Sequence, residues 1–136
     1  MIGKLLDRRI AALVVGIMLF GAGWLAGQQN AATQKTLLHV FAYTPIEGAT
    51  QQDFDNFRKA SGDMVGKVPG LKRVWVGKLR RPLDVADSKR VYGAAMEFDN
   101  ADALDAYAKN PVHTEWQKVY EKVRVEGTTT FDILGD

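Results

Sequence analysis

The chain has 136 residues, of which 46% are hydrophobic, so it can bury one core of ordinary size and leaves no room for a second domain. Its 18 Lys and Arg against 16 Asp and Glu give a net charge of +2, which does not indicate a protein that binds nucleic acid through its phosphates. The absence of cysteine excludes disulfides, thiolate nucleophiles and cysteine-based zinc sites.

The N-terminal segment resembles a membrane anchor. Residues 1–9 are basic, and residues 10–27 form an uncharged apolar run. At ~1.5 Å per residue this run reaches roughly 27 Å as a helix, close to the ~30 Å bilayer core. The positive-inside rule then places the N-terminus in the cytoplasm and the C-terminal domain in the periplasm or outside the cell. A cleaved signal peptide is the alternative, although no A-x-A site precedes the polar linker at residues 28–35.

Small residues mark one face of this predicted transmembrane helix. Gly16, Gly23 and Gly27 share a helical stripe that includes a GxxxG pattern. Such a stripe favours close packing against another transmembrane helix. The alternative is that glycine is simply common in membrane helices.

The remaining residues, 36–136, begin with a strand-like segment, "TLLHVFAYTP". Both of its alternating faces are largely apolar, which predicts a strand covered on both sides. Thr50 and Asp53 then resemble a capping box, and the following helix keeps an apolar face as far as Val68, where "VPG" ends it. "LKRVWVGKL" is the second predicted strand, with Leu71 on the face of Trp75.

Residues 80–90 are predicted to form a polar, charged connection, and "VYGAAMEF" a third strand. The basic side chains of that connection suit a solvated loop, or contact with anionic lipid or a substrate carboxylate. Asn100 is expected to cap a short helix, and Asn110 with Pro111 to begin another. "TTTFDIL" is the final strand.

This order of elements predicts an α+β, ferredoxin-like fold with a four-stranded antiparallel sheet and helices on one face. The other face would be bare in a monomer. We therefore expect a homodimer with two-fold symmetry, packed sheet against sheet.

Four stretches carry a family resemblance: "LLHVFAY", "VPGLKRVWVGK", "YGAAMEFDNADALDAY" and "NPVHTEW". In this order and spacing, residues 36–136 resemble a stress-responsive alpha/beta barrel domain of the dimeric alpha/beta barrel superfamily. The resemblance implies a homodimer with a pocket between the sheet and the helices of each subunit. It does not imply one particular activity.

A member of this family, the plant olivetolic acid cyclase, closes a polyketide by aldol condensation. His113 matches its catalytic base, Tyr107 the tyrosine that assists this base, and His39 a histidine of its cavity. Tyr92 and Ser61 depart from it, since the cyclase has a histidine and a tyrosine at these positions. The resemblance implies a ligand pocket formed by Tyr92, Trp116, Ser61 and Phe41.

Two functions remain open. The first is binding of a small aromatic or polyketide-like ligand, with acid–base chemistry at His113, whose imidazole has an ordinary pKa of about 6.5. The second is a non-catalytic accessory subunit of a larger membrane complex, in which His113 and His39 only pack. The sequence contains no HExxH motif, so neither metal nor cofactor is expected. Haem is kept as an alternative because the superfamily includes haem-degrading enzymes.

Overall fold

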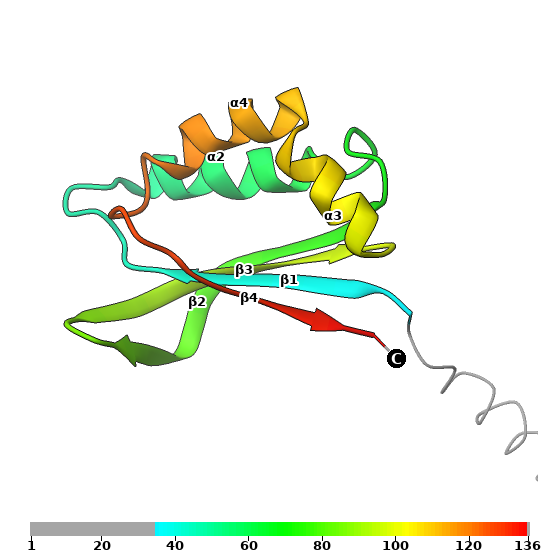
Figure 1. Ribbon diagram of the computed structural model, residues 1–136. Coiled ribbons are helices and arrows are strands. Elements are labelled where there is room, and N and C mark those ends of the chain that lie inside the picture. Colours follow the sequence, from blue (N-terminus) through cyan, green and yellow to red (C-terminus); the bar gives the residue numbers. More distant parts are fainter. Residues whose placement is uncertain (1–34, 136) are drawn as a thin grey trace, which may run out of the picture. The chain divides into compact units, whose positions relative to one another are not determined.

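A computed structural model describes residues 35–135 of the chain. The strands are β1 (Leu37–Tyr43), β2 (Leu71–Val85), β3 (Ser88–Phe98) and β4 (Thr129–Leu134), and the helices are α2 (Gln51–Gly62), α3 (Ala101–Ala108) and α4 (Pro111–Tyr120). The strands pair antiparallel in the order β2-β3-β1-β4, and all three helices cover one face of the sheet (Figure 1). The predicted ferredoxin-like α+β fold is confirmed.

The predicted transmembrane segment, residues 10–27, lies outside the described residues, and so does its glycine stripe. Within residues 35–135, none of the helices has the length and apolar character needed to cross a membrane.

β1 is a central strand of the sheet, with β3 on one side and β4 on the other. Leu37, Phe41 and Tyr43 are buried toward the helices. On the opposite face Leu38 and Val40 are only partly covered. The two apolar faces predicted for this strand are therefore present, but within one chain only one of them is fully covered.

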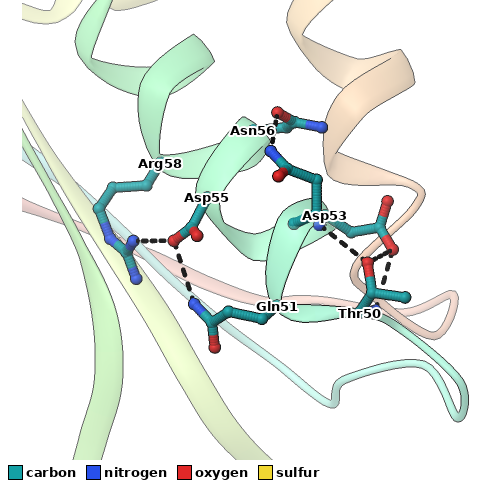
Figure 2. A network of polar contacts seen from close by, with 7 residues as sticks. Thr50, Gln51, Asp53, Asp55, Asn56 and Arg58 are labelled. Carbon is teal, nitrogen blue, oxygen red and sulfur yellow. Dashed lines mark hydrogen bonds and ion pairs between the residues drawn. The ribbon is translucent and has the colours of Figure 1, made fainter.

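α2 begins at the predicted capping box. The backbone N–H of Asp53 donates to Thr50 Oγ1 over 3.2 Å, and the N–H of Thr50 donates to Asp53 Oδ2 over 2.9 Å. Figure 2 shows this reciprocal pair, together with Asp55 accepting from both Gln51 and Arg58 farther along the helix. The reciprocal pair of Thr50 and Asp53 satisfies backbone donors that the start of a helix leaves without partners, whereas the contacts of Asp55 join side chains.

α2 ends at Gly62, earlier than the predicted end near Val68. Two glycines with positive φ, Gly66 at 85° and Gly70 at 79°, redirect the chain into turns that a regular helix does not allow. Met64 and Val68 are still buried in the core, because the turns fold back over the sheet.

The prediction of a polar connection at residues 80–90 is wrong. β2 and β3 instead continue as a hairpin arm in which Leu83 pairs with Arg90 and Val85 with Ser88, after an irregularity that follows Lys78. The turn contains Ala86 with a φ of 48°. Cross-strand pairing can hold charged residues in a strand when their side chains face solvent. In Figure 1 this arm bends away from the helices, so it lies outside the helix-covered core.

A second irregularity changes the face of one residue. The register of β2 against β3 shifts between Leu71 and Arg73, as a β-bulge does. Leu71 is therefore buried in the helix-side core together with Val74, whereas Trp75 is exposed on the other face. The prediction that Leu71 and Trp75 share a face is wrong for this reason.

Candidate functional site

His113 and Tyr107 meet where α3 turns into α4. Asn110 caps α4 by accepting from the N–H of Val112 over 2.9 Å, and Pro111 occupies the first turn, as predicted. This junction brings the rings of Tyr107 and His113 to a centroid separation of 4.3 Å. The Nδ1 atom of His113 lies 3.4 Å from the backbone carbonyl of Ala108.

The electrostatic surroundings of this pair favour uncharged side chains. Burial lowers the pKa of His113, the charge of His39 lowers it further, and the carbonyl of Ala108 opposes both effects. Burial also raises the pKa of Tyr107, so its phenol stays protonated near neutral pH. The Tyr107 hydroxyl donates to Met64 Sδ over 3.8 Å. Near neutral pH His113 is therefore a neutral imidazole that can accept a proton.

His39 lies in β1, directly opposite Asp132 of β4. Its Nδ1 is 2.7 Å from Asp132 Oδ1, so the carboxylate holds one nitrogen of the ring. A carboxylate in this position selects the tautomer with a proton on Nδ1 and leaves Nε2 as the acceptor. Asp132 could not be recognised as this partner from the sequence, because nothing in "TTTFDIL" indicates which residue of the final strand faces His39.

Two aromatic rings connect the histidines. Phe41 is 5.9 Å from His39 and 5.9 Å from Trp116, and Trp116 is 5.7 Å from His113, all measured between ring centroids. The structure therefore brings His39, Phe41, Trp116, His113 and Tyr107 together. We call these five residues the histidine cluster.

The other two predicted pocket residues differ in position. Ser61 borders the histidine cluster, since it accepts a hydrogen bond from Trp116 Nε1 over 2.9 Å and donates to the carbonyl of Phe57 over 2.8 Å. Tyr92 instead stacks on Phe54 and Tyr43, with centroid separations of 4.9 and 5.9 Å. The ring contacts of Tyr92 thus lie outside the cluster.

Two concave surfaces lie near these residues without being lined by either histidine. A groove of ≈ 300 Å³ between α2 and α4 contains Met64 and Trp116. A second groove of ≈ 380 Å³ lies on the sheet face opposite the helices and includes Trp75, Leu83 and Phe131. Among residues 35–135, no three His, Asp or Glu side chains are grouped so as to hold a metal ion.

The fold and this cluster define a ferredoxin-like domain with a helix-covered sheet and two half-buried histidines that are linked through Phe41 and Trp116. Residues 37–133 match the family model described as the stress responsive A/B barrel domain, and the chain belongs to this family. No curated protein matches the chain significantly.

Solved structures of low sequence identity share the fold. A dimeric protein of unknown function from Bacteroides fragilis is 18% identical, with 75% of this chain and 98% of that one covered and a TM-score of 0.58. The hydroxynitrile lyase of Passiflora edulis is 16% identical, with 74% and 94% covered and a TM-score of 0.61. SnoaB, a cofactor-independent oxygenase from Streptomyces nogalater, is 13% identical, with 73% and 91% covered and a TM-score of 0.53.

Proposed function

We propose that this protein binds a small aromatic or polyketide-like molecule at the histidine cluster and that His113 accepts a proton from it. The observation that carries this proposal is the pairing of two imidazoles across Phe41 and Trp116, with His113 kept neutral by burial and His39 held by Asp132. A half-buried neutral imidazole beside aromatic rings suits proton transfer from an organic molecule near neutral pH.

Each member of the cluster has a distinct part in this chemistry. His113 is the proposed base, and Tyr107 positions its ring from the side, since the phenol hydroxyl is directed to Met64. His39 Nε2 supplies a second acceptor or, once protonated, a donor for a developing negative charge. Trp116 lines the groove between α2 and α4 and offers an aromatic ligand a flat apolar surface there, while Phe41 packs edge-on against Trp116 and holds its ring. Two proteins of this fold are described as a hydroxynitrile lyase and a cofactor-independent oxygenase, which supports an enzymatic site on this fold.

The proposal is tested by purifying the full-length chain in mild detergent and analysing what it retains by mass spectrometry. We expect a small molecule to be retained, and His113→Ala to lose it. Thr114→Ala, a change at the exposed neighbouring residue, is the matched control and should retain it. Equal retention by His113→Ala and the control would contradict a ligand site at His113.

We further propose that residues 10–27 anchor the protein in a membrane and that the domain lies in the periplasm or outside the cell. The charge pattern of the N-terminal segment supports this proposal. It is tested by extracting membranes of producing cells with carbonate at high pH. Release of the protein into the soluble fraction would overturn the anchor.

The sheet face opposite the helices supports a homodimer. Trp75, Leu83, Phe131 and Ile133 are 48, 43, 47 and 50% exposed, and such a contiguous set of large apolar side chains marks an interaction surface. The protein of the same fold from Bacteroides fragilis is described as dimeric. We propose that a second copy of the chain covers this face.

The same surface favours a second candidate function, a non-catalytic accessory subunit that docks on a larger membrane complex. The two functions differ in which molecule co-purifies with the protein. A different protein present in equal amount would favour the accessory subunit and contradict a free-standing enzyme.

A further inference from the structure

Two arginines lie at the end of the helix–sheet layer where α4 finishes, whereas His113 lies at the start of that helix. Arg90 of β3 is buried, with 8% of its surface exposed. Arg124 follows α4 on a backbone that is bridged to Pro45. Within residues 35–135 neither guanidinium takes part in an ion pair.

Arg90 is held by neutral groups alone. Its Nε donates to Thr129 Oγ1 over 3.2 Å, and its Nη1 donates to Thr44 Oγ1 over 3.1 Å. Thr44 in turn donates to the carbonyl of Lys89 over 2.9 Å. A guanidinium has five N–H donors, so most of those of Arg90 remain free for another acceptor. A buried cation is costly unless an anion compensates its charge.

Arg124 points toward the same place. Its Cζ lies 4.7 Å from the centroid of the Tyr120 ring, and its Nε is buried without a hydrogen-bond partner. The Tyr120 hydroxyl is 3.0 Å from Thr128 Oγ1. Burial raises the pKa of Tyr120, and the charges of Arg124 and Arg90 oppose this effect. Arg124 thus lies over the Tyr120 ring, and Arg90 contacts Thr129 beside the threonine that holds the Tyr120 hydroxyl.

Gly127 leaves one side of Arg90 uncovered. Its φ is 92°, and a Cβ at this position would have a single neighbour within 4 Å outside the adjoining residues, Nη2 of Arg90 at 3.7 Å. The missing side chain gives a small group access to that nitrogen from the solvent side, since Gly127 is exposed.

We propose that Arg90 and Arg124 form a binding site for an oxyanion, a carboxylate or phosphate group, that enters beside Gly127. Two guanidinium groups with free donors match the planar or tetrahedral oxygens of such a group and recognise it better than a spherical ion. Thr128 and the Tyr120 hydroxyl border the site and can add neutral hydrogen bonds. Tyr120 lies between this site and the histidine cluster, since its ring packs on Phe41 and Trp116, but anion binding does not depend on the chemistry proposed for the cluster.

The test is a titration of the full-length protein in a nonionic detergent with inorganic phosphate and with benzoate, each against sodium chloride at equal ionic strength. The backbone amide signals of Gly127 and Thr128 are followed by NMR. We expect saturable shifts with phosphate or benzoate and none with chloride. Saturation by phosphate alone would assign a phosphate group, and saturation by benzoate alone an organic carboxylate.

Arg124→Gln should weaken this binding at least about tenfold, because it removes a charged donor. Arg58→Gln is the matched control, since Arg58 is exposed and already pairs with Asp55, and it should bind as the wild type does. If Arg124→Gln does not fold, Arg90→Lys replaces it and should also weaken binding. The proposal would be overturned if chloride gave the same shifts as phosphate or benzoate, or if these variants bound with unchanged affinity. It would also be overturned if neither anion caused a shift because a second copy of the chain already fills the site.

Discussion

Burial is the main cause of the lowered pKa of His113, and the charge of His39 adds to it. It is only partly exposed, its ring lies between Tyr107 and Trp116, and its hydrogen-bonding contact is a backbone carbonyl. Asp132 pairs with His39 instead, so the two imidazoles of the cluster have different surroundings. Two similar groups in different environments are the usual arrangement when one accepts a proton and another stabilises charge.

The titration of His113 tests this description. Because burial lowers its pKa, an NMR titration of its ring protons should give a midpoint below the ordinary value of about 6.5. The unfolded chain then binds a proton more readily than the folded one. The part of the folding stability that depends on neutral His113 is therefore fully present above about pH 6.5, the pKa of the unfolded chain. It is lost as the pH falls through the lower pKa that His113 has in the folded protein.

His113→Phe, which keeps an aromatic ring in place, should remove this part of the pH dependence from thermal unfolding curves. A titration midpoint at or above about 6.5 would contradict burial as the dominant influence on the ring.

At the scale of single elements, short local signals fix where the helices begin. Thr50, Asn100 and Asn110 each accept a backbone N–H at the start of a helix, as predicted. A cap needs only neighbouring residues, and it can therefore be recognised without knowledge of the fold. The extended β2–β3 arm is formed by pairing between two strands, and the polar, charged residues 80–90 by themselves indicated only a loop.

Thr50→Ala should lower the free energy of unfolding by about 1 kcal/mol, because it removes the side chain of the capping box. Thr50→Ser retains the hydroxyl and is the matched control. Chemical denaturation of both variants measures the difference. Equal stability of Thr50→Ala and Thr50→Ser would show that the cap does not stabilise α2.

The contact between the turn after α2 and the start of α3 depends on Gly70. A Cβ on this residue would lie 2.6 Å from the Cβ of Ala103, whereas a Cβ on Gly66 would meet nothing within 4 Å. Both glycines have positive φ, at 79° and 85°, so alanine has a similar backbone cost at either position.

Gly70→Ala should therefore destabilise the protein by about 1–3 kcal/mol more than Gly66→Ala, since it adds a steric overlap to the shared backbone cost. Denaturation midpoints of the two variants provide the measurement. Similar losses in both would mean that α3 can shift away from Gly70 without cost.

At the scale of the whole molecule, the sheet has one face under the helices and one face open. Leu37, Phe41 and Tyr43 are buried among helix side chains, while Trp75, Phe131 and Ile133 remain about half exposed. Complete burial of a large apolar side chain contributes roughly 1.5–3 kcal/mol to the free energy of folding or association. If a second copy of the chain covered this face, the burial of several such residues would stabilise the dimer.

Phe131→Glu should convert the proposed dimer to monomers, because it places a charge in the centre of an apolar interface. Val65→Glu is the matched control. Val65 is 42% exposed and Phe131 is 47% exposed, but Val65 lies in the turn after α2, away from the open sheet face. Sedimentation of the full-length proteins in detergent distinguishes the two states. A dimer that persists in Phe131→Glu and dissociates in Val65→Glu would assign the interface to the helices.

The sequence by itself determined the order of strands and helices, the helix caps and the two apolar faces of β1, because these features depend on residues that are neighbours in the chain. Family resemblance added His113, Tyr107 and His39 as candidate site residues. Only the tertiary structure decided that Asp132 holds His39, that Tyr92 lies apart from the cluster, and that Arg124 lies over the Tyr120 ring while Arg90 contacts Thr129 nearby. Those contacts depend on strand register and on the packing of α4 over the sheet, which join residues far apart in the sequence.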